Sequence, residues 1–387
     1  MARTAVIVDA VRTPLGRRGG KLKDWHPVDL ASVVLKALVD RNDFDPALVD
    51  DVVMGCVMQA GEQALNIGRN AVLAAGWPES VPATTIDRQC GSSQQAAHFA
   101  AQGVISGAYD IAVAAGVEVM SRIPMGASLA TRELGTPFSK LVRDRYEPVG
   151  GLQPQGIGAE MIAEKWGVTR DDCDQFSVSS HMKAARATDE GRFQKEMIPV
   201  LDAEGNLMTA DEGIRRESSM ESLGKLKPAF KPDGLITAGN SSQITDGAAA
   251  MLIMTEEMAA KLNMKPRARF HTFALAGVDP VTMLTGPIPS TAKALQKSGL
   301  KADDIDLFEV NEAFAPVVLA WAKELGMPLE RTNVNGGAIA LGHPLGGSGA
   351  RIMATMLNEL ERTGGRFALQ TMCEGGGLAN ATILERL

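Results

Sequence analysis

The sequence predicts an α/β fold, because short apolar runs alternate with segments of helical periodicity along most of its 387 residues. The same succession of strand, turn with a reactive residue, helix and strand occurs twice, once around Cys90 and once around His343 and Cys373. Such a repeat indicates two halves of similar fold. The length also exceeds one ordinary hydrophobic core, so two or three domains are expected.

The first half consists of alternating buried strands and helices. Its predicted strands are short apolar runs that cover 5–8, 51–57, 84–86 and 111–116. Two helices are predicted between these strands, one over 66–75, ended by Gly76, and one over 92–106, ended by Gly107. The second helix begins just after Cys90, which follows the short strand 84–86.

The second half repeats this order. A strand over 304–310 is followed by a glycine turn after 333–335 and by a helix over 349–362 that has one apolar face. The strand 366–372 then leads to Cys373. In both halves the reactive residues fall where strands end, which is where open α/β sheets place their sites.

The segment between the halves has a different pattern. Residues 120–244 contain prolines, glycines and a polar helix over 171–190 instead of further buried strands, and 245–265 return to an apolar pattern. We therefore predict an N-terminal half formed by 1–119 and 245–265, an inserted loop domain over 120–244, and a C-terminal half over 266–387.

The composition, with 45% hydrophobic and 22% charged residues, is typical of a soluble globular enzyme. A formal charge of −7 argues against binding to nucleic acid or to anionic membranes, because both usually need a basic surface. We expect neither a signal peptide nor a membrane span. The four cysteines lack Cys-x-x-Cys spacing, which predicts free thiols and a cytoplasmic location.

Three residues stand in glycine-rich settings, namely Cys90, His343 and Cys373. Glycine lets the backbone approach a ligand closely and exposes N–H groups that can hold an oxyanion. A thiol nucleophile, an imidazole and a second thiol suggest carbon–sulfur or carbon–carbon acyl chemistry. Cys56 and Cys173, which lie in an apolar run and on the polar helix, are interpreted as structural thiols.

Each of the three residues has an expected chemical role. The helix start after Cys90 favours its thiolate, because the helix dipole and free N–H groups face the sulfur. A neutral His343, fixed by Gly342 and Pro344, can take the proton of Cys90. A zinc site is the alternative reading of two thiols and a histidine. The spacing matches no compact zinc pattern and no fourth ligand is evident, so no metal is expected.

Four segments carry a family resemblance: 90–93 (Cys-Gly-Ser-Ser), 311–314 (Asn-Glu-Ala-Phe), 335–344 (Asn-Gly-Gly-Ala-Ile-Ala-Leu-Gly-His-Pro) and 373–377 (Cys-Glu-Gly-Gly-Gly). In this order they resemble the signature segments of the thiolases, and the resemblance covers nearly the whole chain. It implies two stacked βαβαβαββ halves with a loop domain. It also implies thiolytic cleavage of a 3-ketoacyl-CoA to acetyl-CoA and a shortened acyl-CoA, with coenzyme A as a substrate and no resident cofactor.

The resemblance also implies roles for individual residues. Cys90 would carry the acyl group, Cys373 would exchange a proton with the substrate carbon, and His343 would activate Cys90. Asn311 would hold a water that, with His343, stabilises an enolate. The backbone N–H groups of Cys90 and Gly375 would form the oxyanion hole.

Coenzyme A contacts and partners follow more loosely. Arg215 and Ser242 match positions that contact coenzyme A in thiolases, and the alternatives are a solvated basic face and an ordinary turn. The resemblance further implies a homodimer or homotetramer, with a β-oxidation partner subunit as an option.

Two departures from the usual thiolase pattern concern the substrate. Glu374 places a charge beside Cys373, and Pro154 with Gln155 replaces the His-Met that often stands there. We therefore favour acyl chains longer or bulkier than acetoacetyl, with Met120 and Met125 as an apolar lining or as ordinary packing.

Three other functions remain as alternatives. The first is a biosynthetic acetoacetyl-CoA thiolase, and the second is a ketoacyl synthase, which usually pairs its cysteine with two histidines. The third is a non-catalytic acyl-CoA-binding protein.

Overall fold

The computed structural model describes residues 3–129 and 135–387. Within them, nine main strands join in the order β10-β11-β12-β9-β1-β8-β5-β3-β4, and the short β2 (Gly16–Arg17) pairs with β8. The strands of the first half are β1 (Ala5–Arg12), β3 (Asp51–Gly55), β4 (Ala83–Ile86), β5 (Ile111–Val119) and β8 (Thr245–Thr255). Those of the second half are β9 (Ala268–Gly277), β10 (Leu307–Val310), β11 (Phe367–Glu374) and β12 (Leu378–Arg386).

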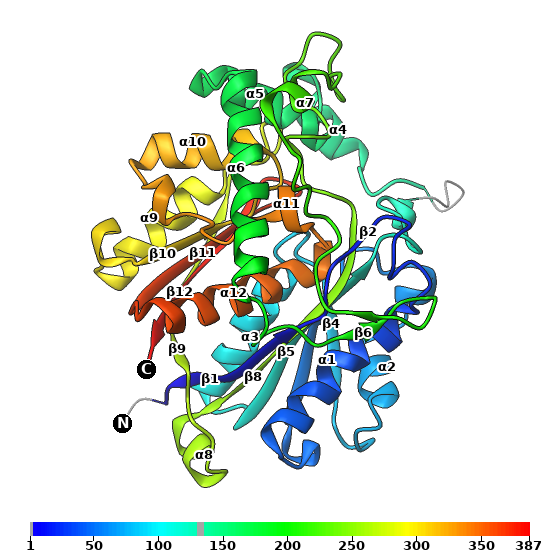
Figure 1. Ribbon diagram of the computed structural model, residues 1–387, viewed down its shortest axis with the longest axis vertical. Coiled ribbons are helices and arrows are strands. Elements are labelled where there is room, and N and C mark those ends of the chain that lie inside the picture. The colour runs from blue at the N-terminus through cyan, green and yellow to red at the C-terminus, as the bar shows by residue number, and fades with distance from the viewer. Residues whose placement is uncertain (1–2, 130–134) are drawn as a thin grey trace.

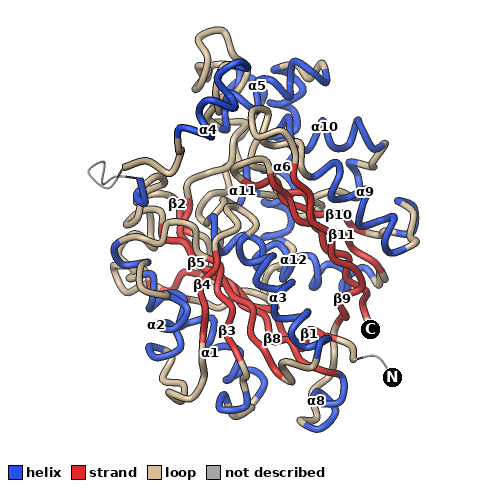
Figure 2. Tube along the Cα trace, turned by 180° about the vertical axis from the view of Figure 1, so that it is seen from behind, coloured by secondary structure: helices blue, strands red, loops and turns tan. Residues whose placement is uncertain are grey.

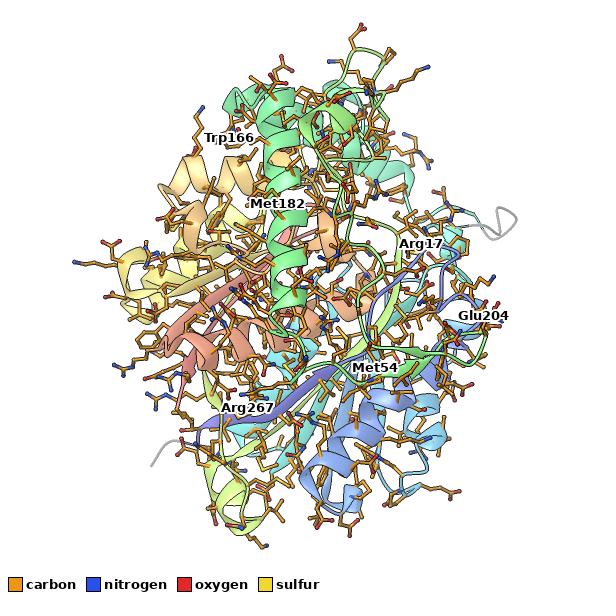
Figure 3. All side chains as sticks on the ribbon, viewed as in Figure 1. Arg17, Met54, Trp166, Met182, Glu204 and Arg267 are labelled. Atoms are coloured by element: carbon orange, nitrogen blue, oxygen red, sulfur yellow. The ribbon has the colours of Figure 1, made fainter. Side chains whose placement is uncertain are left out.

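Among the described residues, the two groups of strands pair with each other only at β1 and β9, through Val6 with Arg269 and Ile7 with Ala268. Figure 2 shows one group on each side of the central helices α3 (Ser92–Ser106) and α12 (Ser348–Thr363). Arg267, labelled in Figure 3, ties the groups together because it pairs with Asp9 of β1 and with Glu361 of α12.

The predicted repeat is confirmed by the strand pairing. In the first half, β3 runs parallel to both β4 and β5. In the second half, β10 runs parallel to β11, and Phe308 of β10 forms a parallel bridge to Thr332. The α/β fold with two similar halves expected from the sequence is therefore present, and in the described residues the strands of the two halves pair at β1 and β9.

Helices cover both groups of strands. The first-half sheet packs its outer face on α1 (Pro27–Asn42) and α2 (Ile67–Ala74), and the second-half sheet packs on α9 (Pro287–Ser298) and α10 (Ala315–Leu325). The helix α8 (Glu256–Lys261) follows β8. Between the sheets, α3 and α12 contact each other. They come close because their facing residues are small: a Cβ atom at Gly349 would lie 2.2 Å from the backbone nitrogen of Gln94.

The predicted helix 349–362 is buried on more than its apolar face. Its polar residues Thr355 and Asn358 donate hydrogen bonds to Glu196, whose carboxylate also pairs with the buried Arg12. Arg12 in turn pairs with Asp211. The inserted segment thus covers the polar face of α12 with a network of buried charges, which a pattern of apolar spacing does not reveal.

The segment 120–244, predicted as an inserted loop domain, contains four α-helices in its described part. These are α4 (Lys140–Tyr146), α5 (Gln155–Trp166), α6 (Arg170–Asp189) and α7 (Met220–Gly224), with a small hairpin of β6 (Val200–Leu201) and β7 (Leu207–Met208). In Figure 1, α6 runs along the front of the molecule between the upper helices and the central layer. The short α11 (Ala338–Leu341) packs against it. In the described part of the chain, no helix combines the length and apolarity that crossing a membrane requires.

Candidate active site

Cys90 lies on the tight turn between β4 and α3, two residues before the helix begins. The preceding Gln89 has a φ of 48°, a conformation that is strained for a residue other than glycine. Two hydrogen bonds hold this turn: the backbone N–H of Gln89 donates to Asp87 at 2.6 Å, and that of Arg88 donates to the Ser92 hydroxyl at 2.9 Å. The backbone thus fixes the thiol at the N-terminus of the helix, where the sequence predicts it.

The resting state of this thiol differs from the prediction. Burial, reinforced by the charge of Glu374, raises the pKa of Cys90 to about 12. The N–H groups of Cys90 and Gly375 and the side-chain amide of Gln155 face the sulfur and lower its pKa, but by less. The expectation that the helix start favours a thiolate is therefore wrong for the resting enzyme. Cys90 needs a base.

His343 has the protonation state that a base requires. Its Nδ1 lies 2.6 Å from the hydroxyl of Ser348, and that hydroxyl donates its single hydrogen to the carbonyl of Pro344 at 2.8 Å. The hydroxyl must therefore accept from Nδ1–H, which leaves a lone pair on Nε2. Burial, together with the charge of Arg351, lowers the pKa of His343 to about 3, so the imidazole is neutral.

The first half of the chain holds the loop of His343 in place. The N–H of Gly346 donates to the buried carboxylate of Glu118 at 2.9 Å. The backbone around Gly346 also packs directly on the ends of β3 and β5, since a Cβ atom at Gly116 would lie 2.2 Å from the Gly346 carbonyl oxygen. Leu345 belongs to the same apolar cluster as Cys90. The loop that carries the base is therefore wedged against the nucleophile's own half.

Asn311 follows β10 and lies beside the imidazole. Its Nδ2 is 3.4 Å from Nε2 of His343, and its Oδ1 is buried without a hydrogen-bond partner among the described residues. An unpartnered buried acceptor next to a basic nitrogen fits a site for a bound water. The neighbouring Glu312 fixes this loop because it accepts hydrogen bonds from Ser180 and from the N–H of Ile339.

Cys373, near the end of β11, is completely buried. Burial raises its pKa well above the usual value, and the next cause is the negative charge that Cys90 carries once it is ionised, so the two sulfurs lie close enough to interact. Gly375, two residues further on, points its N–H at the Cys90 sulfur. The structure therefore brings Cys90, Cys373 and Gly375 together, and it brings His343 and Asn311 together on loops that reach Cys90 through the shared apolar cluster of Leu345. In the described residues, neither sulfur hydrogen-bonds the imidazole directly.

Arg215 and Ser242 lie on neighbouring segments next to this cluster. Gln243 connects them, because its amide donates to the carbonyl of Gly213 at 2.9 Å, and its own carbonyl accepts from the N–H of His343 at 3.2 Å. Arg215 is exposed, and its guanidinium has no ion pair within the described part of the chain. A free cation at the surface beside the site is suited to a phosphate group.

A cavity of about 880 Å³ borders the other side of the site. Pro154, which precedes the Gln155 that faces Cys90, and Gly376, which follows Gly375, are part of its wall. Its remaining lining is mostly apolar and aromatic and includes Phe138, Val142, Tyr146, Leu152 and Met283. Of the two methionines predicted as lining, Met120 is buried in the cluster of Cys90, whereas Met125 is 55% exposed. Neither borders this cavity.

Two residues at the site escaped the sequence analysis. Ser348, the hydrogen-bond partner of His343, is the first residue of α12, and its position in Gly-Gly-Ser-Gly at a helix start is the signal that could have found it. Gln155 was noted only as a departure from a pattern. Its contact with Cys90 depends on how α5 packs on the two halves, which no local pattern encodes.

The comparisons with known proteins agree with this arrangement. A family model described as the thiolase N-terminal domain matches residues 5–257, and one described as the thiolase C-terminal domain matches 264–386. The chain belongs to the thiolase family.

Individual relatives are similar over their full length. The chain is 51% identical over 390 residues to the steroid 3-ketoacyl-CoA thiolase FadA6 of Mycobacterium tuberculosis, covering 99% of this chain and 94% of that protein. It is 44% identical to the 3-ketoacyl-CoA thiolase of Aliivibrio fischeri, over 99% of this chain and 100% of that protein. Human mitochondrial 3-ketoacyl-CoA thiolase in complex with CoA matches with a TM-score of 0.91 at 38% identity, over 100% and 98% of the two chains.

Proposed function

We propose that the protein is a degradative 3-ketoacyl-CoA thiolase whose acyl intermediate is carried by Cys90. The observation that carries this proposal is that two buried thiols interact beside the backbone N–H of Gly375, and that the loop of the neutral His343 packs on Cys90 through Leu345. The full-length similarity to 3-ketoacyl-CoA thiolases supports the same substrate class.

The reaction begins with the proton of Cys90 passing to Nε2 of His343, the unprotonated nitrogen of the ring. The thiolate attacks the 3-keto carbon of the substrate. The resulting oxyanion is held by the N–H groups of Cys90 and Gly375, a contribution of about 3–4 kcal/mol per donor. The bond between C2 and C3 then breaks, which leaves the acyl group on Cys90 and the electron pair on the C2 enolate of acetyl-CoA.

The second thiol completes the cycle. Cys373 gives its proton to C2, and acetyl-CoA leaves. His343 and a water on Asn311 stabilise the enolate oxygen during this step. The thiol of coenzyme A then gives its proton to the Cys373 thiolate, and its sulfur attacks the thioester on Cys90. The shortened acyl-CoA leaves, and the proton held by His343 returns to Cys90.

The acyl group is proposed to be longer or bulkier than that of acetoacetyl-CoA. The cavity of about 880 Å³ is bordered by Pro154 and Gly376, the chain neighbours of the two residues that act on the Cys90 sulfur, and its size is that of a site for a sizeable small molecule. The single methyl group of acetoacetyl-CoA would leave this apolar space unfilled. Arg215 and Ser242 are proposed to contact coenzyme A on the opposite side, next to the loop of His343.

The protein is also proposed to act as a homodimer or homotetramer in the cytoplasm. Strand β4 forms one end of the sheet order, so its outer backbone groups are available for pairing, and the nearby Leu65 is 91% exposed. The four free cysteines fit a reducing compartment.

A series of 3-ketoacyl-CoAs of increasing chain length, including a ring-bearing acyl group, tests the substrate assignment by thiolysis rates. We expect kcat/KM to rise from acetoacetyl-CoA to the longer or bulkier substrates. Turnover of acetoacetyl-CoA well above that of all the others would overturn the chain-length proposal. No thiolysis of any substrate would overturn the function.

The separate roles of the thiols are tested with Cys373→Ala. This variant lacks the proton donor to C2, so carbon–carbon cleavage should slow by about 10²–10⁴. Transfer of a labelled acyl group from acyl-CoA to Cys90, followed by mass spectrometry, should be slowed much less, because a thiolate leaves without a proton far more readily than a carbanion. Equal loss of both steps would contradict the assigned role of Cys373.

A further inference from the structure

Glu374 is a buried carboxyl group that the reaction described above does not use. It is the last residue of β11, follows Cys373 directly and is completely buried. Neither of its carboxyl oxygens has a hydrogen-bond partner among the described residues. An ionised carboxylate that is buried without donors is costly, so its position requires an explanation.

The carboxyl group lies against the turn that carries the nucleophile. A Cβ atom at Gly91 would stand 2.0 Å from Oε1 of Glu374 and 2.8 Å from Nδ2 of Asn380, so both side chains converge on the residue after Cys90. Asn380 donates to the carbonyl of Gly91 at 3.1 Å, while its Oδ1 is buried without a partner. The Oδ1 of Asn380 is therefore an unused hydrogen-bond acceptor among the described residues. A neutral Glu374 carboxyl group has an O–H that could donate to such an acceptor, whereas an ionised one has not.

We propose that Glu374 controls the ionisation of the two catalytic thiols: its carboxyl group is neutral in the working enzyme, and its ionisation opposes formation of the Cys90 thiolate. The inference rests on the proposed function, because it treats that thiolate as the attacking species. A negative charge at Glu374 would stand beside Cys90 and Cys373 in a site with little water, where like charges repel strongly. Glu374 acts through the thiols and not on the substrate.

The electrostatics of the groups around Glu374 agree with this proposal. Burial raises the pKa of Glu374 to about 8, with Asp87 acting in the same direction and Arg88 opposing it. The charge of Glu374 in turn raises the pKa of Cys90 and of Cys373. The charged and titratable groups facing Glu374 are thus Asp87 and Arg88 from the loop after β4, and the two thiols.

The expected consequence is a change of slope in the reactivity of Cys90 near pH 8. Below that pH, Glu374 is neutral and the thiolate fraction rises tenfold per pH unit. Above it, Glu374 loses its proton to solvent and opposes the second negative charge, so the profile flattens. With a pKa of about 8, about ten elevenths of the Glu374 carboxyl groups are ionised at pH 9. Removing the carboxylate should therefore raise the rate of Cys90 alkylation by up to about tenfold at pH 9, and hardly at all at pH 7.

The experiment measures the rate of Cys90 alkylation by iodoacetamide from pH 6 to pH 10, followed by peptide mass spectrometry. Glu374→Gln should abolish the flattening near pH 8 and be up to about tenfold faster than the unmodified protein at pH 9. Glu309→Gln is the matched control: burial also raises the pKa of Glu309 to about 8, but Glu309 is not among the groups that act on the two thiols. It should leave the flattening in place.

Persistence of the flattening in Glu374→Gln, or its loss in Glu309→Gln, would overturn the proposal. If Glu374→Gln does not fold, Asp87→Asn and Arg88→Met replace it. Removing Asp87 lowers the pKa of Glu374 and should move the change of slope to lower pH, and removing Arg88 should move it to higher pH. An unmoved profile in both variants would also overturn the proposal. Since alkylation needs no substrate, its result is independent of whether thiolysis is found.

Discussion

The two halves of the chain present similar central helices, α3 and α12, but deliver the reactive residue before each helix in different ways. In the first half, residues 87–91 join β4 to α3, and Cys90 lies in this short turn. In the second half, residues 333–347 separate the strand-like bridge at Thr332 from α12, and this longer segment holds α11 and His343.

This difference teaches that the nucleophile is fixed locally and the base is fixed by tertiary contacts. The turn of Cys90 is held mainly by its own neighbours, through the positive φ of Gln89 and the hydrogen bonds to Asp87 and Ser92, with one hydrogen bond from the other half, donated by Asn380 to the carbonyl of Gly91. The loop of His343 is held from outside, because Glu118 and Gly116 of the other half bind and contact Gly346. We call the contact of Gly116 and Glu118 with Gly346 the seam between the halves. Mutations at this seam should displace His343 and leave Cys90 in place.

The largest effect on the rate is expected in the turn before α3, because it carries the reactive sulfur of Cys90. Cys90→Ala removes the sulfur and leaves the turn, so thiolysis should fall by about 10⁴-fold or more with an unchanged melting temperature. Steady-state kinetics and thermal unfolding measure the two quantities. Cys173→Ala, a buried thiol on α6 outside the site, is the control and should retain activity. Normal turnover by Cys90→Ala would show that Cys90 is not the nucleophile, and the comparison of the two halves would lose its basis.

A smaller effect is expected at the seam. In Gly116→Ala the new methyl group meets the Gly346 carbonyl oxygen at 2.2 Å and Cβ of Ser93 at 2.6 Å, so backbone must move. We expect a loss of about 1–3 kcal/mol in the free energy of unfolding in urea. Displacement of His343 should also lower kcat by about 10²-fold.

Gly224→Ala is the control for the seam, because a Cβ atom at that position meets no other atom within 4 Å. It should change the free energy of unfolding by less than about 0.5 kcal/mol. If Gly116→Ala kept full activity while alkylation of Cys90 slowed, the seam would act on the nucleophile, and the distinction between the halves would be wrong.

The smallest effect is expected where a single hydrogen bond orients the base. Ser348→Ala leaves Nδ1 of His343 buried without an acceptor, which costs about 1–3 kcal/mol and should lower kcat by roughly tenfold. Ser177→Ala, which removes a buried hydroxyl bonded only to its own helix, should leave kcat unchanged. Equal kinetics in the two variants would show that Ser348 does not orient the imidazole.

Local patterns predicted much of the fold and fewer of the contacts in the site. The helix 92–106 has the bounds of α3, because its apolar spacing and Gly107 are local signals. The strand predicted over 304–310 begins only at Leu307, and the strand predicted over 51–57 ends at Gly55. After Gly55 the buried residues Cys56 and Val57 continue past the last pair of the strand, whereas a turn of 3-10 helix, Ala302–Asp304, overlaps the beginning of the strand predicted over 304–310.

The sequence by itself determined the repeat, the position of Cys90 at a helix start and the glycine-rich surroundings of His343 and Cys373, because each depends on residues adjacent in the chain. Only the tertiary structure decided that the Cys90 thiol rests protonated, that Ser348 and not a carboxylate orients His343, and that Glu374 lies beside both sulfurs without a hydrogen-bond partner in the described part of the chain. The physical reason is that burial, charge and hydrogen-bond geometry at this site are set by segments from both halves and the inserted helices. Their packing is not encoded in any local pattern of residues.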